Sequence, residues 1–152
     1  MTIFGHSRGG LASLALAATE ARVLAVVSLA APVNLAQYVR DLSAFAPSAG
    51  TAVVQFLGGL PAEVPELYAM FEVERLASLI RQPIMLIHGT ADMRVPVEYP
   101  QALELALRKA GNRRVQLELV PGMGHSLELG TAGYQFHRVI ALATSWLNDQ
   151  LG

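Results

Sequence analysis

A serine flanked by glycines stands near the start of the chain and could act as a nucleophile. Residues 5–10 read GHSRGG, follow two apolar residues and precede a run rich in alanine and leucine. This succession predicts a strand, a sharp turn and a helix, with Ser7 at the apex of the turn. A strained turn clashes with bulky neighbours, so we expect Gly5 and Gly9 to serve the turn. Gly10 should let the helix approach the sheet closely.

Two residues far along the chain could supply the base and the acid that this serine needs. His125 follows an apolar run at 115–120, and Asp92 follows another at 83–87. A serine hydroxyl is a weak nucleophile, so we expect His125 Nε2 to take its proton and deliver it to the leaving group. Asp92 would orient the other ring nitrogen. Glu128 and Asp41 are the alternative acids, although neither follows a predicted strand in the right order.

The elements that must position these residues alternate between strand and helix. Apolar and β-branched runs predict strands at 2–5, 22–29, 83–87 and 115–120. Helical periodicity predicts helices at 9–20, from Pro100 to Ala110, and at 131–151. This order indicates an α/β fold with a parallel sheet, right-handed crossovers and helices on both faces. Sites in such sheets form beyond the carboxyl ends of the strands, which is where all three candidate residues fall. Alternating polarity in 115–120 favours an edge position for the last strand.

The stretch 33–82 is the least regular part of the chain. Proline and glycine interrupt its short helical patterns at Pro47, Gly50, Gly58-Gly59, Pro61 and Pro65. We expect a short helical cap or lid here, inserted into a single domain that covers 1–152. One amphipathic face would contain Leu35, Tyr38, Leu42 and Phe45. A second apolar group either lines a substrate pocket or merely covers the sheet: Val53, Phe56, Leu57, Leu67, Tyr68 and Phe71.

Composition excludes several classes of function. The chain has 152 residues, a formal net charge of −1 and no cysteine. The charge offers no electrostatic footprint for nucleic acid or an anionic membrane. No apolar run reaches the ~18 residues of a membrane span, and no secretory leader is visible, so we expect a cytoplasmic protein. Without cysteine, and without histidines at metal-ligand spacing, we expect no disulfide, metal or cofactor.

Residues 83–96 (PIMLIHGTADMRVP) and 115–127 (VQLELVPGMGHSL) carry a family resemblance. They resemble the C-terminal catalytic region of the prolyl oligopeptidase family and its dienelactone-hydrolase-like relatives, within the α/β-hydrolase superfamily. The order Ser, Asp, His along the chain is also the order of that superfamily. The resemblance covers 1–147 and implies Ser7 as nucleophile, Asp92 as acid and His125 as base. It implies hydrolysis of an ester, amide or peptide bond through an acyl-enzyme.

Four more residues are candidates for other parts of the site. The backbone N–H of Arg8 would donate to the oxyanion. His6, Arg94 and Met123 are candidate substrate contacts; a structural role for His6 and a solvated or paired side chain for Arg94 are the alternatives.

Compared with that family, the chain lacks the first four strands of the fold. It therefore also lacks the loop after the third strand, which supplies a second oxyanion donor in the family. We therefore expect either the C-terminal part of a larger hydrolase or a reduced version of one. The nucleophile strand would have a bare edge, which favours a homodimer or other association through it. The competing hypothesis is a catalytically impaired fragment or interaction module that depends on a partner chain or an upstream segment.

Overall fold

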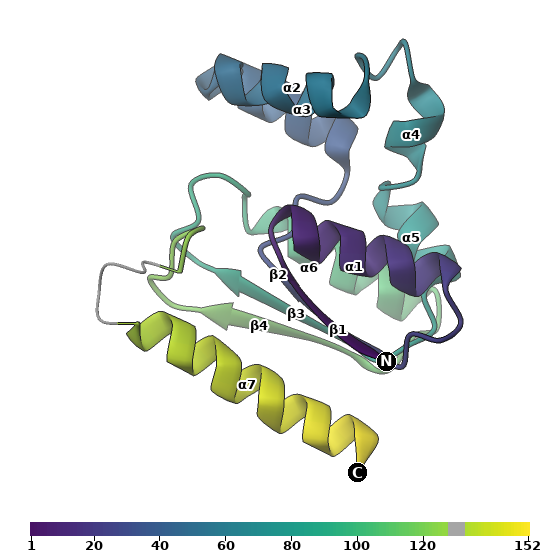
Figure 1. Cartoon of the computed structure of the whole chain (residues 1–152), viewed down its shortest axis with the longest axis vertical. Coiled ribbons are helices and arrows are strands. Elements are labelled where there is room, and N and C mark those ends of the chain that lie inside the picture. The colour runs from purple at the N-terminus through teal and green to yellow at the C-terminus, as the bar shows by residue number, and fades with distance from the viewer. Residues whose placement is uncertain (128–132) are drawn as a thin grey trace.

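The computed structural model describes residues 1–127 and 133–152, and a four-stranded parallel sheet runs through them (Figure 1). The strands lie in the order of the sequence: β1 (Thr2–His6), β2 (Ala25–Leu29), β3 (Ile84–Gly89) and β4 (Val115–Val120). Every residue of β2 and β3 is buried, as expected for strands that are covered on both faces. β1 and β4 form the two edges, which confirms the edge position predicted for the last strand.

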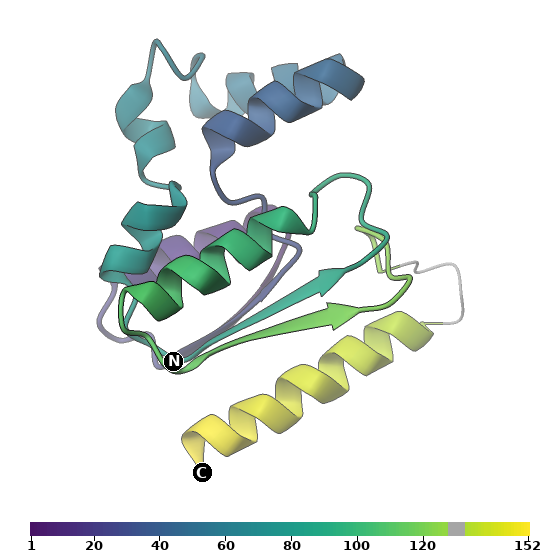
Figure 2. The ribbon, with the colours of Figure 1, turned by 180° about the vertical axis from the view of Figure 1, so that it is seen from behind.

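Helices cover both faces of this sheet (Figures 1 and 2). One face carries α1 (Arg8–Thr19), α5 (Val73–Leu79) and α6 (Glu98–Lys109), and the other carries α7 (Tyr134–Leu151). Alternate strand residues enter the two cores, so that Val26, Ile84 and Leu86 face α1 and α6 while Val27, Met85 and Ile87 face α7. No helix within the described ranges is both long and apolar enough to cross a membrane.

The predicted elements all occur, with shifted ends. β2 begins at Ala25 rather than at residue 22, and α6 begins two residues before Pro100. The expected start of the last helix, residues 131–132, lies outside the described residues. Two apolar residues of α7, Phe136 and Ile140, are exposed, because one helix resting on a sheet buries only a narrow stripe around Val139, Ala143 and Trp146.

The stretch between β2 and β3 forms four helices: α2 (Leu35–Phe45), α3 (Pro47–Leu57), α4 (Pro65–Ala69) and α5. Figure 1 shows α2 and α3 packed against each other at a distance from the sheet, with α4 leading back to α5. Pro47 and Pro65 begin α3 and α4, and Gly58 ends α3 with φ 84°. Gly50 does not interrupt a helix as predicted. It lies buried inside α3, where an added Cβ would stand 2.7 Å from Ser43 Oγ of α2, so it allows the two helices to approach.

A hydrogen-bonded contact ties α2 to the start of α6. The Tyr99 hydroxyl donates to Asp41, whose other oxygen accepts a hydrogen bond of 2.6 Å from the Gln37 amide. The Tyr38 ring meets the Tyr99 ring edge-on, with centroids 6.2 Å apart. Burial, followed by the hydrogen bond to Asp41, raises the pKa of Tyr99, so its hydroxyl stays a donor. Asp41, an alternative acid by sequence, is thus engaged by Tyr99 and Gln37.

Replacing Tyr99 by Phe should loosen α2 and α3. The change removes one hydrogen bond to a carboxylate, so we expect the free energy of unfolding to fall by about 1–3 kcal/mol. Relative to wild type, we also expect the variant's amide hydrogen exchange to speed up more in α2 than in the sheet. Tyr134→Phe, at an exposed position of α7, is the matched control and should change neither quantity. Unchanged exchange in α2 of the Tyr99→Phe variant would contradict this account of the contact.

Candidate active site

Ser7 stands at a strained turn between β1 and α1. Its backbone has φ 55° and ψ −118°, in the left-handed half of conformational space that L-residues with side chains avoid. Two hydrogen bonds hold it there. Its N–H donates to the Leu29 carbonyl of β2 at 2.8 Å, and its carbonyl accepts from Leu11 in α1 at 3.0 Å. The turn therefore presents the Ser7 hydroxyl at the carboxyl end of the sheet, as the sequence motif predicts.

Two of the three glycines near Ser7 are required by close packing. A Cβ at Gly5 would overlap the Gly9 carbonyl, and one at Gly10 would stand 2.9 Å from Ser28 Oγ. Gly10 therefore brings α1 close to the sheet as predicted. The prediction for Gly9 was wrong, because a Cβ there meets nothing within 4 Å and no positive φ is needed. Only Gly5 is needed to avoid a steric clash within the turn.

The structure brings the side chains of Ser7, His125 and Asp92 together in one hydrogen-bonded row. His125 Nε2 lies 2.9 Å from Ser7 Oγ, and His125 Nδ1 lies 2.8 Å from Asp92 Oδ2. A carboxylate can only accept, so the proton of a neutral His125 belongs on Nδ1 and the lone pair of Nε2 faces the serine hydroxyl. The His125 side chain is largely buried and that of Asp92 fully so, which shields both bonds from water.

Asp92 is kept ionised by hydrogen bonds that outweigh its burial. Burial acts to raise the pKa of this carboxyl, but the bond from His125 and those from two backbone N–H groups bring it below its ordinary value. The two backbone donors are Arg94 at 2.8 Å and Val95 at 2.9 Å, both on Oδ1. At neutral pH Asp92 is therefore a carboxylate that can orient an imidazole.

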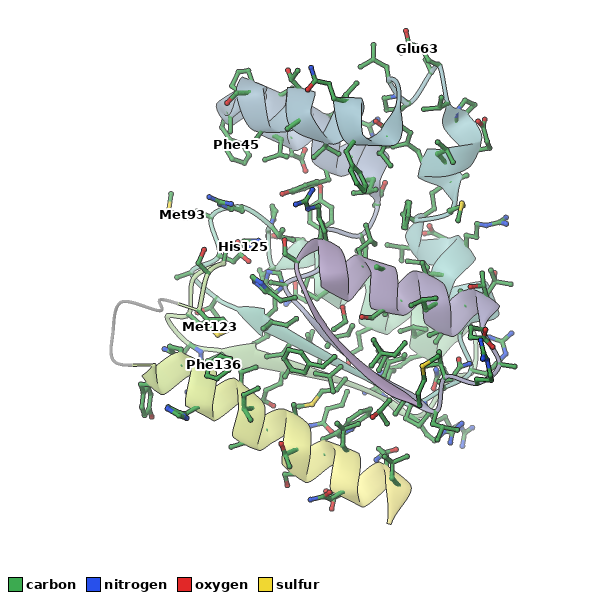
Figure 3. All side chains as sticks on the ribbon, in the orientation of Figure 1. Phe45, Glu63, Met93, Met123, His125 and Phe136 are labelled. Carbon is green, nitrogen blue, oxygen red and sulfur yellow. The ribbon has the colours of Figure 1, made fainter. Side chains whose placement is uncertain are left out.

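The loops that carry Asp92 and His125 contact each other directly. The Thr90 hydroxyl oxygen accepts from the Gly122 N–H at 2.9 Å, and the Ala91 N–H donates to the Met123 carbonyl at 3.1 Å. A Cβ at Gly89 would overlap that same carbonyl, so the close approach depends on glycine. Met123 itself is fully buried between the sheet and α7 (Figure 3). Its predicted contact with substrate was therefore wrong, because its side chain packs in the core.

His6 and Arg94, the other expected substrate contacts, have specific places. His6 Nε2 lies 2.7 Å from the His125 carbonyl oxygen, and the two imidazole rings stand 5.2 Å apart. His6 thus donates to the backbone of His125. The position of His6 next to Ser7 in sequence indicates that it lies near the site, but it does not indicate this partner. Arg94 has an exposed side chain, and its backbone N–H is the group that contacts Asp92.

The helical stretch between β2 and β3 reaches this site through α3. The Arg8 guanidinium lies over the Phe56 ring, with Cζ 5.6 Å from the centroid, and Phe56 is 72% exposed. Of the other residues considered for a pocket, Val53, Leu57 and Phe71 pack against the core, and the Tyr68 hydroxyl donates to the Gly59 carbonyl. Phe56 therefore places a largely exposed aromatic ring against the side chain of Arg8, the residue that follows Ser7.

Two further expectations concern the acid and a metal. Glu128, an alternative acid, lies outside the described residues. Within residues 1–127 and 133–152, no group of three or more acidic or histidine side chains is arranged to hold a metal ion.

Solved structures of low sequence identity share this fold. An acylaminoacyl peptidase from Pyrococcus horikoshii matches 99% of this chain and 24% of its own length, with a TM-score of 0.77 and 19% identity. An esterase from Pyrococcus furiosus matches 99% of this chain and 54% of its own length, with a TM-score of 0.66 and 18% identity. A monoacylglycerol lipase from Paleococcus ferrophilus matches 98% of this chain and 68% of its own length, with a TM-score of 0.63 and 20% identity. The chain thus spans about half of that esterase and a quarter of that peptidase.

The parallel sheet, its crossovers and the turn at Ser7 correspond to part of an α/β-hydrolase catalytic domain. No significant match was found among curated proteins. The model of the prolyl oligopeptidase family matches residues 1–152. The chain therefore belongs to the prolyl oligopeptidase family, a family of serine peptidases and esterases, which confirms the resemblance noted in the sequence.

Gly5 and Gly9 offer a matched test of the turn. Gly5→Ala forces a Cβ into backbone atoms, and we expect the free energy of unfolding to fall by about 1–3 kcal/mol or more. Gly9→Ala places its methyl in open space within a helix, so stability should stay the same or rise by up to about 1 kcal/mol. Urea denaturation of both variants measures the difference. Equal losses of stability in the two variants would show that the turn does not have this geometry.

Proposed function

We propose that this chain is a serine hydrolase that cleaves an ester or a peptide or amide bond through an acyl-enzyme. The observation that carries the proposal is the row of two hydrogen bonds from Ser7 through His125 to the buried Asp92. A nucleophile, a base and a group that orients the base are the three parts that acyl transfer requires. Membership of a family of peptidases and esterases supports the same chemistry.

The proposed reaction has two halves with the same proton route. Ser7 Oγ attacks the substrate carbonyl carbon while His125 Nε2 takes the hydroxyl proton, and Asp92 stabilises the resulting imidazolium. His125 then gives that proton to the leaving alcohol or amine, and the acyl group stays on Ser7. Water attacks the acyl-enzyme, losing a proton to His125. The carboxylic acid departs as the proton returns to Ser7 Oγ.

The oxyanion of this reaction needs hydrogen-bond donors. The N–H of Arg8 lies in the first turn of α1, where backbone donors have no partner within the helix. It directly follows the nucleophile, and the positive end of the helix dipole adds to its effect. We propose it as one oxyanion donor. Loss of one such donor slows acyl transfer by roughly 10²–10³ in other hydrolases, so the supply of a second donor would set the rate of the isolated chain.

The proposed substrate presents an apolar group to the site. Phe56 of α3 is largely exposed, and its ring contacts the guanidinium of Arg8, the residue that follows the nucleophile in sequence. Formal net charge is close to zero, so steering of a charged substrate by the whole molecule is weak. We therefore infer that an acyl or side-chain group of low polarity packs there.

Labelling with a fluorophosphonate, which bonds to an activated serine oxygen, tests the nucleophile. We expect wild type to be labelled and Ser7→Ala to be unlabelled, and we expect hydrolysis of a short-chain nitrophenyl ester to fall on the order of 10⁴-fold or more in that variant. His125→Ala should show a comparable loss. Comparing the nitrophenyl ester with an aminoacyl nitroanilide then separates esterase from peptidase.

A second histidine gives the matched control. His137 is exposed on α7, so His137→Ala should keep both labelling and turnover. Equal rates in wild type and Ser7→Ala would overturn the catalytic proposal and favour an interaction module.

We also propose that two copies associate through β1. Among the described strands only β2 pairs with it, and Met1, Phe4 and Leu24 around this edge are exposed. The Met1 carbonyl and the Ser7 N–H both point at β2, so by alternation the backbone groups of Phe4 point away from the sheet. An open strand edge with apolar neighbours invites pairing with a second strand.

Sedimentation velocity over a range of concentrations measures this association. We expect a dimer in wild type and a monomer in Phe4→Lys, because charge on an edge strand opposes strand pairing. Leu16→Lys, at an exposed position of α1, should leave the dimer intact. A wild-type chain that stays monomeric at all concentrations contradicts the proposal.

A further inference from the structure

Two buried polar atoms beneath the candidate active site lack a hydrogen-bond partner within the described part of the chain. They are Ser28 Oγ in β2 and His88 Nδ1 in β3. The residues are 2% and 0% exposed, so neither atom can be solvated from outside. Buried polar side-chain atoms almost always have a partner, and an unpaired one calls for an explanation.

Both residues line the same small cavity. Ser28 and His88 lie on the face of the sheet that α1 and α6 cover, as the alternation of their strands requires. Apolar side chains of Leu14, Leu86 and Leu103 complete the walls. The cavity volume is ≈ 10 Å³, about what one water molecule needs.

The spacing of the two residues suits a single bridging molecule. Ser28 pairs with Leu86 across the sheet, and His88 lies two residues further along β3. Strand geometry then puts the two Cα atoms roughly 8 Å apart. The serine hydroxyl and the imidazole nitrogen make no hydrogen bond to each other in the structure, and one water between them would bond to both.

The other ring nitrogen shows what His88 Nδ1 needs. His88 Nε2 lies 2.8 Å from the Val95 carbonyl oxygen. A carbonyl only accepts, so Nε2 carries the proton. Burial lowers the pKa of His88, which keeps the ring neutral and leaves Nδ1 a bare acceptor. A neutral donor is therefore required at Nδ1, and the Ser28 hydroxyl can donate or accept as needed.

We propose that this cavity binds one structural water, which donates to His88 Nδ1 and hydrogen-bonds to Ser28 Oγ, and that His88 held in this way is a positioning residue for Asp92. The water site stands on the cavity and its two polar atoms alone. The positioning role rests also on the function proposed above.

The route from the water to the acid runs through Val95. His88 Nε2 holds the Val95 carbonyl, and the Val95 N–H donates to Asp92 Oδ1 at 2.9 Å. The same His88 nitrogen lies 3.6 Å from Asp92 Oδ2, beside the oxygen that faces His125. On its other side the Ser28 hydroxyl lies close to Gly10 of α1, because a Cβ at Gly10 would stand 2.9 Å from Ser28 Oγ. One water would thus connect β2, whose Leu29 carbonyl holds the Ser7 N–H, with the loop that carries Asp92.

Nuclear magnetic resonance on the full chain tests the water site. We expect Overhauser effects from a long-lived water to protons of Ser28 and His88, and a ¹⁵N shift of His88 Nδ1 typical of a hydrogen-bonded acceptor. Ser28→Val replaces the hydroxyl and fills the space, so the water signals should vanish and the Nδ1 shift should move to that of a free lone pair.

Ser13→Ala is the matched control, because Ser13 is an equally buried serine whose hydroxyl donates to the Gly9 carbonyl. It should leave the His88 signals unchanged. Absence of water signals at both residues in wild type, or signals that persist unchanged in Ser28→Val, would overturn the water site.

Kinetics of nitrophenyl ester hydrolysis test the positioning role. His88→Phe should lower kcat about tenfold with KM unchanged. The reason is that the lost hydrogen bond to Val95 would weaken stabilisation of the transition state by about the contribution of one hydrogen bond. His88→Gln, which can donate to Val95 and accept from the water, should recover part of that loss. Wild-type kcat in His88→Phe would overturn the positioning role. If wild type fails to react with fluorophosphonate, the function proposed above fails, while the resonance experiment on wild type and Ser28→Val still decides the water site.

Discussion

Close contact between the end of β1 and the start of α1 governs the geometry of the whole site. Gly5 and Gly10 have no Cβ at the two points where helix and sheet meet, and Ser7 lies between them. The left-handed backbone of Ser7 costs about 1–3 kcal/mol, and bonds to both β2 and α1 hold it in place. Without this contact the hydroxyl would not point out of the carboxyl end of the sheet.

The parallel sheet supplies the other condition. Because its four strands are parallel, their carboxyl ends lie on the same side of the sheet. Residues that are far apart in sequence can therefore meet just beyond these ends. Ser7 follows β1, Asp92 follows β3, and His125, which is labelled in Figure 3, follows β4. Backbone hydrogen bonds then refine the placement, and they come from groups with no chemistry of their own, such as the N–H of Val95.

Much of this arrangement could be predicted from local sequence patterns. Buried strands read as apolar runs, and Ser7, Asp92 and His125 each come shortly after one. Their common location beyond the carboxyl ends of the strands could therefore be inferred. Contacts between distant side chains could not. Nothing near Met123 indicates that it packs under α7, and nothing near Asp41 indicates Tyr99, which lies 58 residues away. The identity of a glycine likewise does not reveal whether its neighbour is solvent, as at Gly9, or another helix, as at Gly50.

The direct bonding between the Thr90 and Gly122 loops has a consequence for how the site is assembled during folding. Asp92 and His125 are 33 residues apart, whereas His125 and Ser7 are 118 residues apart. Closing the longer loop costs about 1 kcal/mol more chain entropy. The segment from β3 to His125 also contains α6 and the β3–β4 pairing, which can bring Asp92 and His125 together from local contacts. Chain entropy therefore favours forming the contact between Asp92 and His125 before Ser7 joins it.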